Sequence, residues 1–285
     1  GGDGTPIVFS HGLLFSGAMF EAQARTLSPR FRCIRYDHRG QGQSEDPGGR
    51  SHTIEASYSD AIALIEALGV APCHFVGLSM GGFVGMRIAA RRPELLRSLV
   101  VIDSSADAEP EENIGRYRLL TAVARWIGIG PIVGQVMPIL FSRTFLGDPS
   151  RQEERTRWRR FLGSNPRTIV RAVLGVIERD GVANELATIT LPTLVIVGEE
   201  DVATTPEKAE RIHALIRCAR LVRVAAAGHA FTMDQPEFVF DAIADFLATV
   251  GILPGVLLCC LCSASPLRPS MSTTRFIPPR PKRRR

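Results

Sequence analysis

The chain has 285 residues, of which 45% are hydrophobic. A chain of this length and composition can bury a sizeable core and is compatible with one large domain that carries an insertion. The formal net charge is +5, but residues 251–285 hold seven basic residues and no acidic one, whereas the preceding 250 residues hold 27 basic and 29 acidic side chains. The part expected to fold therefore has no excess of basic side chains, and we expect no nucleic-acid partner.

The cysteine pattern argues against a bound metal. Six cysteines are present, none in a Cys-x-x-Cys pair beside histidine ligands, so neither a metal nor a cofactor is expected. Cys33, Cys73 and Cys218 fall in or near apolar segments and are predicted to be buried free thiols. No signal peptide is visible, although the sequence does not begin with Met, and a cytoplasmic location is expected. The apolar stretch at 251–262 is shorter than the about 20 residues that span a bilayer, so no membrane association is expected.

The first hundred residues alternate short apolar runs with helical patterns. The apolar runs at 7–9, 31–36, 73–78 and 99–102 predict strands, and the patterns at 17–28, 53–69 and 82–92 predict helices. Strands that alternate with helices indicate an α/β fold, with a parallel sheet covered on both faces.

The pattern changes in residues 107–180, which contain only helical segments, at about 113–126, 131–142, 150–162 and 166–179. These residues are predicted to form a helical insertion. Strands resume at 193–198 and 221–224, and a final helix is expected to end the fold near Val250. Residues 251–285 are rich in Ser, Pro and Arg, and are predicted to form a disordered basic tail.

The stretch Gly77-Leu78-Ser79-Met80-Gly81 lies where a predicted strand meets a predicted helix. A serine at such a sharp turn projects its hydroxyl away from the sheet, where a base can reach it. As a bare pattern Gly-x-Ser-x-Gly is weak, and an ordinary strand-to-helix turn is the alternative. The context strengthens it, because Asp201 follows the strand at 193–198 and His229 follows the strand at 221–224. A histidine with a pKa near 6.5 is suited to take the serine proton.

These residues together make the chain resemble the α/β-hydrolases, with Ser79, Asp201 and His229 at the positions of that superfamily's nucleophile, acid and base. Two further stretches, Ser10-His11-Gly12 and Asp37-His38-Arg39-Gly40-Gln41-Gly42-Gln43-Ser44, match family loops. The likeness covers residues 5–250.

The resemblance implies the α/β-hydrolase fold, a mostly parallel sheet with helices on both faces and a helical cap inserted after the family's sixth strand. The core would then comprise residues 1–106 and 181–250, and the cap residues 107–180. Members of the family normally have two strands in a hairpin before residue 7, so that N-terminal hairpin is expected to be missing.

The acid has several candidates. Glu199, Glu200 and Asp201 all follow the same strand, and the family spacing Gly-x-x-Asp selects Asp201. Asp103, which ends the preceding strand, is a rival because some relatives place their acid there. The resemblance also implies a backbone oxyanion hole at Leu13 and Met80.

Several further side chains are predicted to contact substrate. They are apolar: Leu14, Phe15, Trp126 and Phe231. No Arg or Lys lies beside the serine or the His11-Gly12 loop, but an arginine of the cap could point inward, with Arg116, Arg118, Arg125 and Arg143 as candidates.

The function expected from the resemblance is that of a metal-free serine hydrolase. It would cleave carboxylic esters of small to medium apolar substrates through an acyl-enzyme, as a monomer or homodimer. The most similar group is the capped esterases and the 3-oxoadipate enol-lactonases, so a lactonase is the nearest alternative. A carbon–carbon bond hydrolase and a cofactor-free perhydrolase are further alternatives, and a ligand-binding protein that keeps the triad without turnover is a hypothesis of another class. Serine at this turn argues against the dehalogenases and epoxide hydrolases of this fold, which use Asp.

Overall fold

A computed structural model describes residues 2–252, and the strands among them form a single six-stranded sheet. The strands lie in the order β2-β1-β3-β4-β5-β6, and every neighbouring pair is parallel. Their bounds are Thr5–Ser10 for β1, Phe31–Tyr36 for β2, Cys73–Leu78 for β3, Leu96–Ile102 for β4, Thr193–Gly198 for β5 and Ala219–Val224 for β6. The predicted α/β fold with a parallel sheet is confirmed.

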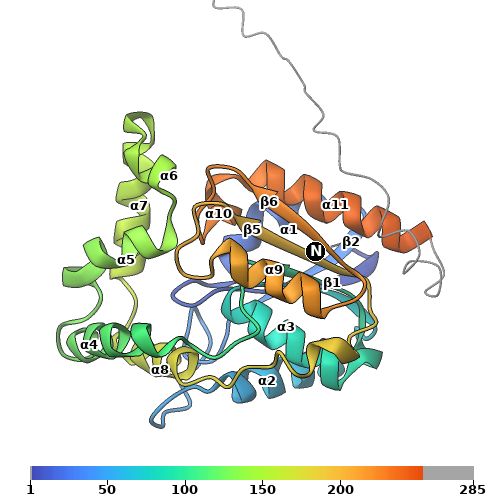
Figure 1. Cartoon of the computed structure of the whole chain (residues 1–285), viewed down its shortest axis with the longest axis horizontal. Coiled ribbons are helices and arrows are strands. Elements are labelled where there is room, and N and C mark those ends of the chain that lie inside the picture. Colours follow the sequence, from blue (N-terminus) through green and yellow to red (C-terminus); the bar gives the residue numbers. More distant parts are fainter. Residues whose placement is uncertain (1, 253–285) are drawn as a thin grey trace, which may run out of the picture.

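Helices cover both faces of the sheet (Figure 1). The helices α1 and α11 lie on one face, and α2, α3 and α9 lie on the other. Their bounds are Glu21–Leu27 for α1, Ile54–Ala67 for α2, Met80–Arg91 for α3, Pro206–Leu215 for α9 and Pro236–Ile252 for α11. Short helical turns occupy Gly17–Phe20, Pro93–Leu95, Leu186–Thr188 and, as α10, Phe231–Asp234.

The two faces are two separate hydrophobic cores, because successive strand residues point to opposite sides of a sheet. In β3, Val76 packs into the core beneath α1 and α11, whereas Phe75 packs into the core beneath α2, α3 and α9. All six residues of β3 and of β5 are buried. Burial on both faces explains why these strands read as continuous apolar runs and not as alternating ones.

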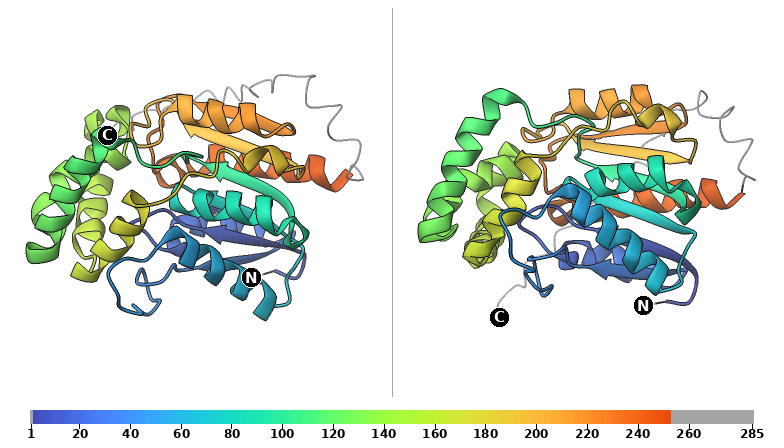
Figure 2. Two further views of the ribbon diagram at one scale, coloured as in Figure 1. Left: turned by 60° about the horizontal axis from the view of Figure 1, so that its bottom comes forward. Right: turned by 90° about the horizontal axis from the view of Figure 1, so that it is seen from below.

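Between β4 and β5 the described chain contains helices and no strand. These helices, which we call the insertion helices, lie beyond one end of the sheet (Figure 2). They are α4 at Glu111–Ile127, α5 at Val133–Leu140, α6 at Arg143–Gly147, α7 at Gln152–Gly163 and α8 at Val170–Ile177, with short turns at Gly130–Ile132, Pro149–Arg151 and Arg167–Ile169. The strand before them is β4, the fourth of the six strands in the described sheet.

Several element bounds differ from the sequence prediction. The helix after Ser79 begins at Met80 and not at residue 82, because Gly81 and Gly82 are accommodated inside its first turn. Strand β4 begins at Leu96, and α11 continues to Ile252. Cys73 is a buried free thiol as predicted and Cys33 is buried, whereas Cys218 is disulfide-bonded. The predicted tail lies outside the described residues from 253 onward.

Candidate active site

Ser79 lies at the turn between β3 and α3 in a strained backbone conformation, with φ of +51° and ψ of −111°. Few residues with a side chain adopt such a positive φ. The glycines on either side allow neighbouring backbone to approach: a Cβ on Gly77 would lie 2.3 Å from the Gly81 carbonyl oxygen, and a Cβ on Gly81 would lie 2.0 Å from that of Ser10. The glycine spacing of the sequence motif therefore has a steric cause in this fold.

His229 is held by Asp201. The two atoms His229 Nδ1 and Asp201 Oδ2 are 2.8 Å apart, and both residues are buried. Asp201 also accepts hydrogen bonds from the Thr204 hydroxyl at 2.7 Å and from the amides of Ala203 and Thr204 at 2.7 and 3.0 Å. Burial raises the pKa of Asp201, but the charge and hydrogen bond of His229 and the hydrogen bonds of Thr204 outweigh it and lower this pKa to about 2. Asp201 is thus an ionised acceptor that orients the imidazole with Nε2 directed away from it.

Ser79 and His229 line one cavity of about 160 Å³. No hydrogen bond joins the Ser79 hydroxyl to the imidazole among the described residues, which is common in unliganded sites, where such contacts tighten when substrate binds. The structure therefore brings Ser79, His229 and Asp201 to one place, and leaves the serine within a cavity that a small molecule can enter.

The rival acids have other partners. Asp103 is fully buried at the end of β4, and its Oδ1 accepts the amide of Gly198 at 2.9 Å. Glu200 accepts both the amide and the hydroxyl of Thr144 in α6, at 2.9 and 2.7 Å, and so connects this loop to the insertion helices. Glu199 faces Arg223 at 3.5 Å. Of the four candidates, Asp201 is the one hydrogen-bonded to His229.

The backbone amides of Leu13 and Met80 are free to act as donors. Neither N–H donates a hydrogen bond to another residue in the described part of the chain. Met80 is the first residue of α3, where helical amides have no partner within the helix, and the positive end of the helix dipole favours negative charge there.

Buried hydrogen bonds fix the loop that carries Leu13. The ring of His11 donates from Nδ1 to the Gly12 carbonyl oxygen at 2.8 Å, and its Nε2 accepts the amide of His38 at 2.9 Å. This pattern requires a neutral ring, and burial lowers the pKa of His11 to about 4. The amide of the next residue, Leu14, donates to Gln41 Oε1 at 3.0 Å. His11 therefore has a positioning role in this structure.

The residues that line the cavity agree only in part with the predicted substrate contacts. Leu13 and Leu14 line the cavity, as do apolar side chains of the insertion helices, among them Leu120, Ala124, Ile132, Val136, Leu140, Val173 and Ile177. Phe15 instead packs against Trp158 and Phe161, and Phe231 is fully buried at the start of α10. Trp126 is 77% exposed and lies on the outer surface of α4. Helical spacing places Trp126 on α4 but does not show which way the helix is turned.

Two charged residues of the cavity are not marked by any pattern in the sequence. Arg179 and Glu109 line it as a buried ion pair, with Nη1 and Oε2 2.9 Å apart. The four arginines named as candidates, Arg116, Arg118, Arg125 and Arg143, do not line it. Arg179 and Glu109 flank the insertion on either side, and no motif marks them.

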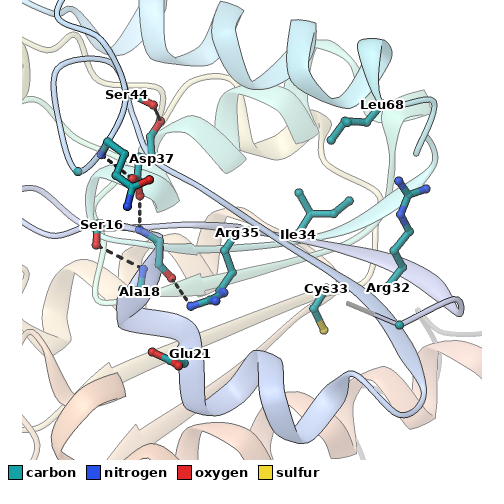
Figure 3. A pocket seen from close by; sticks show the side chains of 14 residues that line it. Ser16, Ala18, Glu21, Arg32, Cys33, Ile34, Arg35, Asp37, Ser44 and Leu68 are labelled. Atoms are coloured by element: carbon teal, nitrogen blue, oxygen red, sulfur yellow. Dashed lines mark hydrogen bonds between the residues drawn. The ribbon is translucent and has the colours of Figure 1, made fainter.

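A larger hollow of about 780 Å³ lies along the outer edge of β2 and contains none of these groups (Figure 3). Asp37 borders it and accepts the amides of Gly17 and Gln43 at 2.7 and 2.8 Å. These bonds give the Asp37–Ser44 loop a scaffold role. Among residues 2–252, no three His, Cys, Asp or Glu side chains are grouped to hold a metal ion. No helix in that part is long and apolar enough to cross a membrane.

Comparison with known proteins identifies the family. The Alpha/beta hydrolase family matches residues 7–242. The protein named "Putative carbamate hydrolase RutD" of Caulobacter sp. (strain K31) is 28% identical over 86% of this chain and 91% of its own. A thermophilic esterase from Thermogutta terrifontis, solved with malate bound, is 31% identical, with a TM-score of 0.80 over 87% of this chain and 91% of its own. The enol-lactonase from Burkholderia xenovorans LB400 is 27% identical, with a TM-score of 0.79 over 87% and 92%. The chain therefore belongs to the alpha/beta hydrolase family.

Proposed function

We propose that the protein is a serine hydrolase that cleaves carboxylic esters of small to medium apolar substrates through an acyl-enzyme. The observation that carries this proposal is the cavity in which Ser79 and His229 meet, with His229 hydrogen-bonded to the buried, ionised Asp201. A serine hydroxyl is a weak nucleophile, and this arrangement supplies the base and the group that orients it.

In the proposed mechanism, Ser79 Oγ attacks the ester carbonyl carbon while His229 Nε2 takes the hydroxyl proton. The imidazolium that forms keeps its Nδ1–H on Asp201, whose negative charge stabilises it. His229 then gives the proton to the leaving alcohol, and the acyl group remains on Ser79. A water molecule, deprotonated by His229, releases the acid and restores the serine.

The tetrahedral intermediate carries a negative oxygen, for which we propose the amides of Leu13 and Met80 as donors. Both N–H groups are unused by the described residues, and one lies at the N-terminus of α3. Removal of one such donor in comparable sites costs about 3 kcal/mol of transition-state stabilisation. Because the donors are backbone groups, the side chains around them remain free to shape an apolar pocket.

We further propose that residues 107–180 form a cap over this site and set its substrate range. Support comes from the cavity lining, much of which belongs to α4, α5 and α8. The cap is attached to the catalytic loops by the Glu200–Thr144 bonds and by the Ala230 amide, which donates to the Leu140 carbonyl oxygen at 2.8 Å. A volume of 160 Å³ lies below the range of about 300–1,000 Å³ that is usual for ligand sites, which favours short acyl chains.

A lactonase is the second candidate, because the enol-lactonase from Burkholderia xenovorans matches at a TM-score of 0.79. A lactone is an ester whose alcohol and acid are joined, so the same residues would open it by the same steps.

The decisive test is turnover of p-nitrophenyl butyrate by the purified full chain, followed by a panel of acyl lengths and lactones. We expect many turnovers per molecule and their loss in Ser79→Ala. Stoichiometric acylation without release, or no reaction in folded protein, would instead identify a binding protein that retains the triad. A higher kcat/KM for lactones than for open esters would assign the lactonase.

A further inference from the structure

The cavity beside Ser79 has further polar side chains in its wall. Glu109, Tyr117 and Arg179 line it, among walls that are mostly apolar. The side chains of Arg179 and Glu109 are 2% and 8% exposed. A buried ion pair costs desolvation energy that apolar residues of similar volume would avoid. Its position in the wall of the cavity therefore points to a role in recognising what the cavity holds.

The ion pair leaves donors of Arg179 unused. Its Nη1 donates to Glu109 at 2.9 Å and to the Val176 carbonyl oxygen at 2.8 Å. Its Nε is buried and has no hydrogen-bond partner among the described residues, and Nη2 donates to none of them either. Glu109 is satisfied, because its other oxygen accepts from Asn113 Nδ2 at 3.0 Å. Nη2 is therefore the donor that an oxygen atom of a ligand in the cavity could meet, whereas Nε is enclosed by the protein.

The position of Arg179 limits how far that oxygen lies from Ser79. The guanidinium lies over the ring of Phe83, 4.3 Å from its centroid, and the Phe83 amide donates to the Ser79 carbonyl oxygen at 3.0 Å. Arg179 is thus near the first turn of α3, and one turn rises about 5.4 Å. At about 30 Å³ per water-sized group, 160 Å³ holds about five such groups. A short acyl chain can span this distance.

Charge decides which acceptor fits. Glu109 already neutralises Arg179, so a substrate carboxylate at Arg179 would also lie near the Glu109 carboxylate and be repelled. A neutral carbonyl oxygen accepts a hydrogen bond from Nη2 without that repulsion. We propose that the Arg179–Glu109 pair selects neutral esters whose acyl chain carries a second carbonyl a few atoms from the scissile one, as in 4-oxoacyl esters. This inference rests on the proposed hydrolase function and names its substrate class.

The test compares two esters that differ by one ketone oxygen, p-nitrophenyl 4-oxopentanoate and p-nitrophenyl pentanoate. Their kcat/KM values are divided by their rates with hydroxide, which removes the intrinsic difference in reactivity. We expect the 4-oxo ester to be favoured at least about tenfold, equivalent to about 1.4 kcal/mol. In the double variant Arg179→Met/Glu109→Gln this ratio should fall to about one. The double variant is used because Arg179→Met alone would leave Glu109 buried without its partner.

Two further variants control the comparison. Arg118→Met removes an arginine of the same insertion whose side chain is 59% exposed, and should keep the wild-type ratio. Arg179→Lys keeps the charge beside Glu109 but lacks the fork of N–H donors, and should lower the ratio even if the double variant does not fold. A preference that survives both Arg179→Lys and the double variant, or wild-type protein that hydrolyses both esters equally, would overturn the inference and leave the hydrolase function standing.

A binding measurement separates this inference from the proposed function. Ser79→Ala cannot form the acyl-enzyme, so calorimetry with methyl 4-oxopentanoate and methyl pentanoate reports affinity alone. We expect the 4-oxo ester to bind at least about tenfold more tightly, and this difference to disappear when the ion pair is also removed. If the wild-type protein turns over no ester, the proposed function fails and calorimetry decides the inference by itself. Equal affinity for the two esters, or no binding of either, would then refute it.

Discussion

Replacement of Asp201 by Asn changes the charge beside His229 while keeping the shape of the side chain. In the native protein Asp201 accepts from Ala203, Thr204 and His229. An Asn side chain can still accept the two backbone amides with its oxygen, but then turns its NH₂ group toward His229 Nδ1. The imidazole would have to accept there, which puts its proton on Nε2 and leaves no base facing Ser79.

The magnitude follows from two effects. An imidazole held in the wrong tautomer reduces kcat about 10⁴-fold in comparable triads, which is about 5.4 kcal/mol of barrier. Stability changes less: the pKa of Asp201 falls from 3.8 to about 2 in the folded protein, worth about 2 kcal/mol. Because the folded pKa is the lower one, this contribution is present above pH 4 and is lost as the pH falls from about 4 to 2. Asp201→Asn should remove it at neutral pH.

Activity is assayed as turnover of p-nitrophenyl butyrate at about pH 7.5, and stability is measured by urea unfolding. The matched control is Asp103→Asn, which retains an oxygen for the Gly198 amide. We expect kcat of Asp103→Asn to stay within about tenfold of wild type, since Asp201 is the acid hydrogen-bonded to His229. A larger loss of kcat in folded Asp103→Asn than in Asp201→Asn would refute the assignment of the acid.

Three further results are expected. Gly81→Ala should prevent folding or lower Tm by many degrees, because its Cβ would lie 2.0 Å from the Ser10 carbonyl oxygen of β1. The control Gly134→Ala in α5 meets open space and should raise Tm slightly. Equal Tm values for the two variants would contradict the steric account. Glu200→Gln should lower kcat/KM several-fold by loosening the attachment of α6 through Thr144, and an unchanged kcat/KM would show that this contact is dispensable. Neutral short esters should exceed matched dicarboxylate half-esters in kcat/KM at least about tenfold, because Arg179, the one arginine in the cavity wall of the described chain, is already paired with Glu109. A higher kcat/KM for the anionic ester that decreases as the salt concentration rises would favour the lactonase.

Local sequence patterns were sufficient for the order of elements and for the turn at Ser79. The apolar runs that predict β3 and β5 are buried on both faces, and that burial is what removes the polar alternation from their sequences. The requirement for Gly77 is equally local, because it lies against the Gly81 backbone, whereas Gly81 is required by the Ser10 backbone of β1, which is distant in sequence. The ends of helices were less certain. Gly81 and Gly82 suggested a later start for α3 than Met80, since glycine propensity in isolation disfavours a helix that tertiary contacts here stabilise.

The partners within the site were decided by the tertiary structure. Asp103 and Asp201 follow two adjacent parallel strands, β4 and β5. The family spacing favoured Asp201, and the packing of the loop carrying His229 determines that the imidazole meets it. The same holds for the cavity wall. Trp126 faces outward and Arg179 faces inward because each helix or loop of the insertion is oriented by the surface it buries, and that surface is assembled from segments as distant as residues 13 and 229. Helical periodicity in the sequence indicates that one face of a helix is buried, but the folded chain determines which residues pack against that face.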